Sequence, residues 1–197
     1  MKLQQNILHL KPREESGSKT ARKYTFQKDL SLFILLSLHE KKEDYVFLFD
    51  FHEDLVVLDS ASNPDKMDFF QIKSKDSGNW TIRDLTKSEK NKLSILGKLY
   101  TNKINFNNNT NSLNFISNAH FRFKKLTSGD DSLKKSIIKA SELEKDDYTT
   151  INDSLKSEHK LSNEADFKDI TQFYVTKLSN KDSSTHCLGE LNRLINK

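Results

Sequence analysis

The chain has 197 residues, of which 35% are hydrophobic and 30% are charged, and this length suits one domain spanning residues 1–197. The mean hydropathy of −0.73 is polar, yet 13 Phe, 5 Tyr and 1 Trp are too many aromatic residues for a disordered chain. No apolar run reaches the length of a membrane span, and a single cysteine excludes a disulfide framework and a multi-cysteine zinc site. We therefore expect a soluble protein of a reducing compartment, with no membrane partner.

The charges are unevenly spread along the chain. Residues 44–70 carry seven acidic side chains and one basic one, whereas residues 71–105 carry eight basic and three acidic ones. A metal-dependent phosphodiesterase needs such a pattern, because the acids can hold the metal while the bases contact the polyanion. Solvated faces that alternate in sign would give the same pattern, and both interpretations stay open.

The first half of the chain predicts an opening segment, a helix and three strands. Residues 1–23 are polar and contain Pro and Gly, so we expect them to be extended. Apolar residues at helical spacing predict a helix from Tyr24 to about Glu40. Compact apolar runs predict strands over 45–51, 55–58 and 67–73. The second of these strands is apolar on both faces, which is typical of a central strand.

The second half predicts further helices and strands. In chain order we expect a helical turn at Thr81, a helix over 88–104, a loop over 105–111, strands over 112–117 and 172–178, and a closing helix over 188–195. Residues 118–125 mix aromatic and basic side chains and are expected to be exposed. Residues 126–165 are interpreted as a helical insertion. Helices alternating with strands in this way predict the α/β class.

One pair of predicted strands carries a polar pattern: Asp54, sixteen intervening residues, then Gln71-Ile-Lys73. Residues two apart in a strand share a face, so Gln71 and Lys73 point the same way. An antiparallel return of the 67–73 strand can bring Asp54 close to both. A carboxylate and an amide oxygen suit Mg²⁺, and a neighbouring lysine can orient or deprotonate an attacking water.

This pattern is weak by itself, because Asp, Gln and Lys are common and a polar strand edge would look the same. Its position gives it weight, since it lies in the most apolar β-region of the chain, where Gln and Lys are poor strand choices. Glu53 could be a second ligand, although in a regular strand it points away from Asp54. His52 could shuttle protons, but one histidine beside acids is more often a surface residue.

These residues resemble a known pattern. Asp54 with Gln71-Ile-Lys73 is similar to the PD-(D/E)XK motif of restriction-endonuclease-like proteins, in its Q-x-K variant. Residues 13–21 (REESGSKTA), 24–27 (YTFQ) and 115–121 (FISNAHF) are similar to segments of the CD-NTase-associated dsDNA endonuclease family, whose members are antiphage effectors. The likeness covers residues 12–125 well and the remainder loosely.

The resemblance implies a fold and an activity. The fold would be a restriction-endonuclease-like mixed sheet flanked by helices, and the activity would be hydrolysis of double-stranded DNA with Mg²⁺ or Mn²⁺. Asp54 would be the principal metal ligand, Gln71 would replace the usual acidic ligand, and Lys73 would be the catalytic lysine. Gln27 would face the site from its helix. Because Gln71 is neutral, Glu53 or a backbone carbonyl would assist in holding the metal.

The resemblance also implies partners. One active site cuts one strand, so double-strand cleavage implies a homo-oligomer. The family's nuclease domain is usually fused to a sensor domain for a cyclic oligonucleotide, for which 197 residues leave no room. We therefore expect the sensor either as a separate regulator or as a domain outside this sequence. The implied location is the bacterial cytoplasm.

Two aromatic-basic segments are candidates for contacting DNA through phosphates or base stacking. The first contains Lys75, Trp80, Arg83 and Lys87, and the second contains Arg122 and Lys124 between Phe121 and Phe123. Ordinary amphipathic packing would explain the first segment equally well.

Two other classes of function remain open. A catalytically silent nuclease fold could bind DNA or a partner protein, and the neutral Gln71 favours this alternative. A pure interaction module could use the alternating charge for protein contacts, and it would show no DNA binding at any salt concentration.

Overall fold

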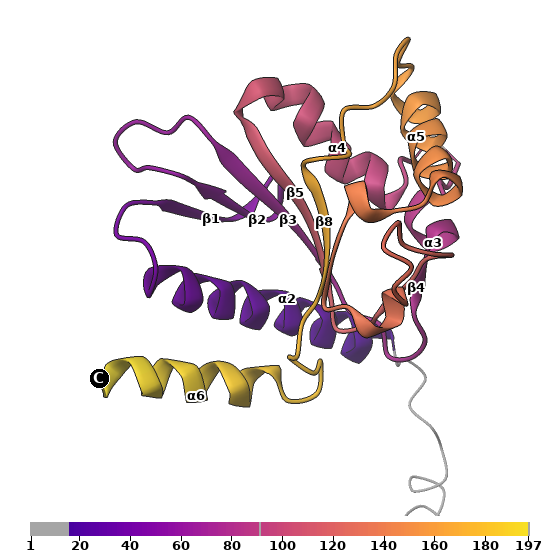
Figure 1. Ribbon diagram of the computed structural model, residues 1–197. Helices are drawn as coiled ribbons and strands as arrows, with labels where there is room; N and C mark the ends of the chain where they lie inside the picture. Colours follow the sequence, from indigo (N-terminus) through magenta and orange to yellow (C-terminus); the bar gives the residue numbers. More distant parts are fainter. Residues whose placement is uncertain (1–15, 91, 197) are drawn as a thin grey trace, which may run out of the picture.

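The computed structural model describes residues 16–90 and 92–196, and its centre is a mixed sheet (Figure 1). Six strands lie in the order β1-β2-β3-β5-β8-β7. Strands β1, β2 and β3 form an antiparallel meander, β3, β5 and β8 run parallel, and β7 is antiparallel to β8. A separate ladder pairs β4 with β6 in parallel. The bounds are Val46–Phe51 (β1), Glu53–Leu58 (β2), Met67–Lys73 (β3), Trp80–Thr81 (β4), Thr110–Ser117 (β5), Phe121–Arg122 (β6), Ile137–Lys139 (β7) and Thr171–Val175 (β8).

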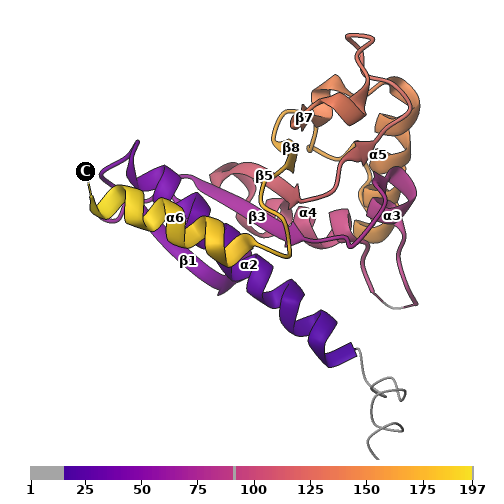
Figure 2. The ribbon, with the colours of Figure 1, turned by 90° about the horizontal axis from the view of Figure 1, so that it is seen from below.

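Helices cover both faces of the central sheet. On one side lie α2 (Ser16–His39) and α6 (Ser183–Ile195), next to each other, and on the other side lie α3 (Ile82–Thr86), α4 (Ile95–Phe106) and α5 (Lys145–His159) (Figures 1 and 2). Short 3-10 turns span Asn107–Asn109, Ser132–Lys134 and Ala140–Glu142. The expected α/β class, with a central mixed sheet flanked by helices, is therefore confirmed.

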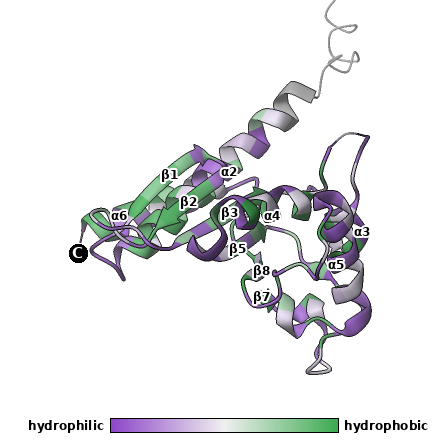
Figure 3. Ribbon diagram, turned by 90° about the horizontal axis from the view of Figure 1, so that it is seen from above, coloured by the Kyte–Doolittle hydropathy of each residue, from purple (hydrophilic) through white to green (hydrophobic). Residues whose placement is uncertain are grey.

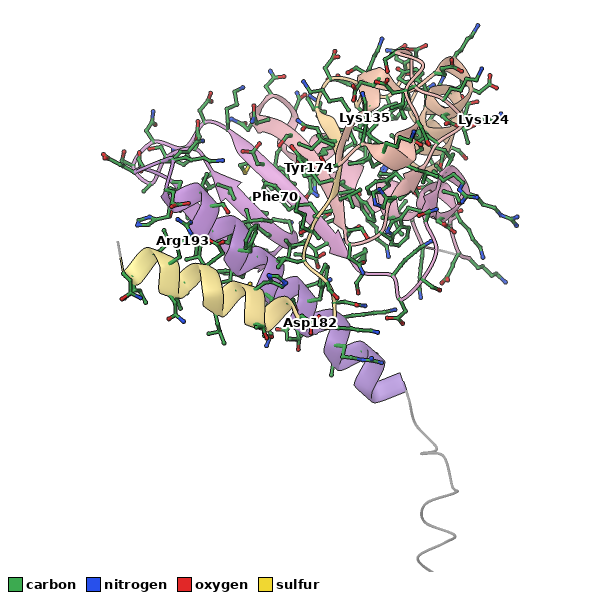
Figure 4. The ribbon with its side chains drawn as sticks, turned by 60° about the horizontal axis from the view of Figure 1, so that its bottom comes forward. Phe70, Lys124, Lys135, Tyr174, Asp182 and Arg193 are labelled. Atoms are coloured by element: carbon green, nitrogen blue, oxygen red, sulfur yellow. The ribbon has the colours of Figure 1, made fainter. Side chains whose placement is uncertain are left out.

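Each face of the sheet has its own hydrophobic cluster. The larger cluster packs against α4 and α5 and includes Val56, Phe69, Leu99, Phe115 and Phe173. The smaller cluster joins α2 to the sheet through Phe26, Leu30, Ile72, Ile116 and Leu178, with Phe70 and Tyr174 packed against it (Figure 4). Neighbours in one strand enter different clusters because side chains alternate between faces. Hydropathy is highest along β1 and β2, whereas α3 is largely hydrophilic (Figure 3).

Helix α6 fixes the position of α2. At one end, the hydroxyls of Ser183 and Ser184 donate to Asp29 Oδ2 at 2.6 and 2.7 Å. At the other end, Arg193 donates two hydrogen bonds to the Glu40 carboxylate at 3.0 and 2.9 Å. A guanidinium that binds a carboxylate with two donors defines orientation as well as distance. These contacts set α2 against the sheet.

The opening segment differs from the expectation. Residues 16–23 form the first turns of α2, so the expectation of an extended chain is wrong there, and the rest of 1–23 lies outside the described residues. Thr20, Ala21, Arg22 and Lys23 contain no helix breaker, and Ala, Arg and Lys are good helix formers. The single Gly at position 17 is tolerated within the helix.

Two further expectations are corrected. The helix expected over 88–104 begins only at Ile95, because Ser94 caps it and accepts a hydrogen bond from Gly97 N at 2.9 Å. Phe121 and Phe123 were expected to be exposed, but they are 0% and 5% exposed. Their rings stack with a centroid distance of 5.9 Å inside the larger cluster.

The remaining elements agree in type and differ in extent. The closing helix begins at Ser183 instead of 188, and the last predicted strand is the shorter β8. Residues 126–165 contain α5 but also β7, which pairs with β8 at one edge of the sheet. In the part of the chain that the structure describes, no helix is both long and apolar enough to cross a bilayer.

Candidate active site

The candidate site lies where β2 and β3 stop pairing. Their antiparallel register runs from Leu58 opposite Met67 to Leu55 opposite Phe70. Beyond that point the Asp54 carboxylate takes the place of a strand acceptor, since its Oδ2 accepts the backbone N–H of Ile72 at 2.6 Å. The aspartate is therefore fixed between two strands rather than left free on a loop.

A second hydrogen bond to the Asp54 carboxylate comes from helix α2. Gln27 Nε2 donates to Asp54 Oδ1 at 3.1 Å and to the backbone oxygen of Ile72 at 2.9 Å. Both Asp54 oxygens thus have fixed partners. Gln27 therefore contacts Asp54 from its helix.

Lys73 approaches the same carboxylate from the end of β3. Its Nζ lies 4.0 Å from Asp54 Oδ2, and the two side chains are 37% and 18% exposed. The aspartate and lysine are therefore on one side of the sheet edge and within reach of solvent. An ammonium and a carboxylate in this relation can together orient a water or a phosphate oxygen.

A second carboxylate and Gln71 form the deeper part of the site. Gln71 Nε2 donates to Glu53 Oε2 at 3.1 Å, and Asn102 Nδ2 from α4 donates to Glu53 Oε1 at 2.9 Å. Glu53, Asp54 and Gln71 line one open hollow of about 340 Å³ together with Asp50 and His52. Glu53 is bound by Asn102 of α4 and Asp54 by Gln27 of α2, on opposite sides of the sheet as strand alternation predicts, and both carboxylates reach the hollow.

The tight β1–β2 turn leads directly into the hollow. Both Asp50 and His52 have positive φ, 51° and 62°, which is uncommon for residues other than glycine. Glu53 is the first residue of β2 and follows directly from this turn, and it lines the hollow together with Asp50 and His52.

The electrostatics of the site favour a cation. Burial, with the nearby charge of Asp54, raises the pKa of Glu53 to about 7. Burial also raises the pKa of Asp54, although Lys73 and the Ile72 N–H partly offset it. Two carboxylates whose charged forms are disfavoured would be relieved by a bound positive charge.

Unpaired oxygens mark the same place. Among the described residues, two buried side-chain oxygens lack a hydrogen-bond partner, Gln71 Oε1 and Ser74 Oγ, and they flank Lys73. Buried polar atoms are normally paired, so an unpaired amide oxygen beside two carboxylates fits a missing ligand.

The donor chemistry indicates which ligand would fit. Carboxylate and amide oxygens suit Mg²⁺, which binds through few protein ligands and keeps several waters. In the described part of the chain, no group of three or more His, Cys, Asp or Glu side chains is arranged to hold a metal, which makes a zinc-type site a poor fit. Asp54, Glu53 and Gln71 Oε1 are the residues that could hold Mg²⁺ here.

The first predicted DNA-contact segment is partly used inside the protein. Trp80 is 7% exposed and its Nε1 donates to Ser117 Oγ at 2.7 Å. Lys75 Nζ lies 2.9 Å from Asp84 Oδ2 and 4.3 Å from the Trp80 ring centroid. This leaves little of the indole for stacking on a base. Arg83 and Lys87 are exposed, on α3 and at its end.

The second segment lies farther along the α3–α5 side. Arg122 is exposed in β6, opposite Thr81 of β4. Lys124 lies beside α5, where its Nζ pairs with Asp146 at 3.1 Å, and Figure 4 shows it on the far side of the sheet from α2. The structure does not bring Lys124 to the group around Asp54 and Lys73.

The structure also adds residues that sequence reasoning missed. Tyr24, Lys23 and Lys28 of α2 line hollows of about 350 and 320 Å³ that they share with Gln27, next to Asp54 and Lys73. Their spacing along one helix was a usable signal, since residues three or four apart lie on one helical face. Asn102 gave a weaker signal, as one polar residue inside a predicted amphipathic helix.

A mixed six-stranded sheet flanked by helices is consistent with a restriction-endonuclease-like α/β fold. Residues 15–197 match the family model described as Cap4, dsDNA endonuclease domain. The chain belongs to this family, and it is a double-stranded DNA endonuclease domain. No curated protein and no solved structure matches the chain.

Proposed function

We propose that this domain hydrolyses phosphodiester bonds of double-stranded DNA with Mg²⁺, or Mn²⁺, at the Asp54–Gln71–Lys73 site. The observation that carries the proposal is the 4.0 Å approach of Lys73 Nζ to an Asp54 carboxylate whose neighbour, Gln71 Oε1, is buried and unpaired. Family membership supports the substrate, and the donor set supports the metal.

The residues would act in distinct ways. Asp54, Gln71 Oε1 and Glu53 would hold the metal, which supplies positive charge on the phosphate and lowers the pKa of a bound water. Lys73 would donate to the attacking water or to a phosphate oxygen and stabilise the negative charge that develops. Gln27 would keep the Asp54 carboxylate in place through its bond to Oδ1.

Basic side chains near the site would contact the DNA backbone. Lys87, Lys92 and Lys98 line a hollow of about 330 Å³, and the charge of Lys98 acts on the Glu53 carboxylate. With Arg83, they would bind phosphates rather than read bases. Binding should weaken steeply as salt increases, because counterions are released from the DNA.

The wider biology is part of the same proposal. The sequence resemblance supports an antiphage effector of the bacterial cytoplasm, controlled by a cyclic-oligonucleotide sensor in another domain or chain. Cleavage of both strands by a single site per chain supports a homo-oligomer on DNA. If purified protein is inactive, addition of cyclic oligonucleotides and of a partner chain belongs to the assay.

The proposal is tested by cleavage of supercoiled plasmid with Mg²⁺. Lys73→Met removes the ammonium and keeps the stem, and Lys177→Met removes an exposed lysine beyond β8 as the matched control. Loss of a group that stabilises the transition state typically costs a hundred- to a thousandfold, so we expect about that loss for Lys73→Met alone. Thermal unfolding confirms that both variants are folded.

Two results would contradict the proposal. Equal cleavage by the wild type and Lys73→Met would place hydrolysis elsewhere or in a contaminant. Salt-sensitive DNA binding without cleavage by the wild type, with each cation and activator, would establish the catalytically silent alternative that the neutral Gln71 favours.

A further inference from the structure

An aromatic pocket adjoins the candidate active site between α2 and β1. It measures about 350 Å³ and shares Gln27 and Asp54 with the site. Tyr24 of α2 and Phe49 of β1 line it with exposed fractions of 49% and 50%. The pocket is therefore continuous with the place where a phosphodiester would be cut, and its walls include two half-exposed aromatic side chains.

The polar groups of the pocket restrict what can fill it. Lys28 Nζ lies 4.9 Å from the centroid of the Tyr24 ring, so a cation stands beside the aromatic wall. Asp50 lines the other side and offers carboxylate oxygens as acceptors. An apolar peptide side chain would leave Lys28 and Asp50 without a use. A nucleotide matches all three features, because its base has stacking faces and N–H donors and its phosphate is anionic.

We propose that this pocket receives one unstacked nucleobase of the DNA substrate, next to the phosphate that is hydrolysed. Tyr24 and Phe49 stack on the base, Lys28 contacts a neighbouring phosphate, and Asp50 accepts from the edge of the base. The inference rests on the proposed nuclease function and adds a requirement to it. A base must leave the duplex stack, which is easiest where its pairing partner is missing.

Binding measurements test this proposal without depending on turnover. Lys73→Met protein with Mg²⁺ is titrated with two fluorescein-labelled duplexes, one fully paired and one with a single abasic site opposite a thymine. Base–aromatic stacking predicts that the duplex with the abasic site binds about tenfold more tightly. Adding Tyr24→Ala or Phe49→Ala should reduce this preference to less than about twofold.

Two matched variants separate stacking from general effects. Tyr24→Phe keeps the ring and should keep the preference. Phe51→Ala removes an equally exposed aromatic residue (49%) of the same strand that does not line the pocket, and it should also keep the preference. Because Tyr24 and Phe49 are half-exposed, these substitutions are expected to leave the fold intact, which thermal unfolding checks.

The outcomes distinguish this inference from the proposed function. Equal affinity for the two duplexes, or a preference that survives both Tyr24→Ala and Phe49→Ala, would overturn the base pocket. If the wild type still cleaves plasmid in that case, the nuclease proposal stands. If no DNA is bound at all, both proposals fail together.

Discussion

Two groups of acidic side chains in this protein meet opposite conditions. Next to β7, the carboxylates of Glu142 and Asp130 both contact Lys135 Nζ, at 2.9 and 3.4 Å. Partial burial acts to raise the pKa of Glu142, but hydrogen bonds from Lys135 and from the backbone of Lys139 outweigh it and lower the pKa. These acids have cations beside them, and their charge contributes to stability.

At the start of β2 the balance is reversed. Glu53 and Asp54 are adjacent, and burial outweighs their favourable contacts and raises both pKa values. Lys73 is the nearest cation, yet it stands 4.0 Å from Asp54 and is partly exposed. These acids make the folded chain less stable by themselves.

The difference fits the proposal that the acids near β7 stabilise the fold whereas those of β2 bind a metal. A protein that needed only stability would pair or neutralise both carboxylates of β2, as it does near β7. Perturbed acids in an open hollow, beside an unpaired amide oxygen, are typical of a functional site. Substitutions in each group of acids test whether the two groups differ in this way.

The largest expected effect follows from Asp54→Asn. A divalent cation at about a hundred times its Kd stabilises a protein by about 2.7 kcal/mol, so Mg²⁺ should raise the thermal midpoint of the wild type, and a chelator should reverse the shift. Asp54→Asn should lose most of this response. Cleavage should fall at least about a hundredfold, since even changes beyond the ligands cost up to that much.

Asp130→Asn is the control from the other group. It removes an acid that already has a lysine partner, so the response to Mg²⁺ and the cleavage rate should stay as in the wild type. A midpoint that rises equally in the wild type, Asp54→Asn and Asp130→Asn would mean that Mg²⁺ binds elsewhere on the protein.

A second prediction concerns Glu158, an acid whose carboxylate is bound by hydrogen bonds rather than by a cation. A Cβ at Gly97 of α4 would overlap the Glu158 carboxylate, which accepts from Ser94 N and Oγ at 3.2 and 3.0 Å. Because the overlapping atoms end a flexible side chain, Gly97→Ala should displace Glu158 and break its bonds to Ser94, which costs about 1 kcal/mol relative to Gly189→Ala as measured by urea unfolding.

Gly189→Ala on α6 is its matched control. Nothing lies within 4 Å of a Cβ at this position, so alanine should stabilise the helix by up to about 1 kcal/mol. If Gly97→Ala were as stable as Gly189→Ala, the hydrogen bonds from Ser94 to Glu158 would contribute little to the stability of the fold.

Much of the β2–β3 geometry could be predicted from the sequence. The spacing of Asp54, Gln71 and Lys73 needs only strand alternation and one antiparallel turn, both of which are local. The contact of Glu53 with Asn102 of α4 could not be predicted, because it joins residues 49 positions apart in the chain.

The burial of Trp80 could not be predicted from the sequence either. Trp80 among basic residues looks like a stacking platform, but its indole is held by Ser117, which is 37 positions away in the chain. Strand β7 was missed for a related reason, since three residues are too few to show a period. In both cases contacts distant in sequence decide the outcome.

The smallest expected effect concerns pH. The pKa of Glu142 is lowered from 4.5, so its charged form stabilises the fold above that value, and this contribution is lost as pH falls through the lowered pKa. Glu142→Gln should therefore be slightly less stable than the wild type at neutral pH. The difference in thermal midpoint should shrink well below pH 4.5. Asp153→Asn, at an exposed position of α5, should show no such convergence.

The direction of this pH effect distinguishes Glu142 from the acids of β2. An acid whose pKa is raised in the folded protein, as for Glu53 and Asp54, does not destabilise the fold when it is protonated at low pH, because protonation removes a buried charge. If the gap between the wild type and Glu142→Gln widened at low pH, Glu142 would behave like the acids of β2. Lys135 would then not stabilise the charged form of Glu142. Glu142 would not differ from Glu53 and Asp54 in the way that the comparison requires.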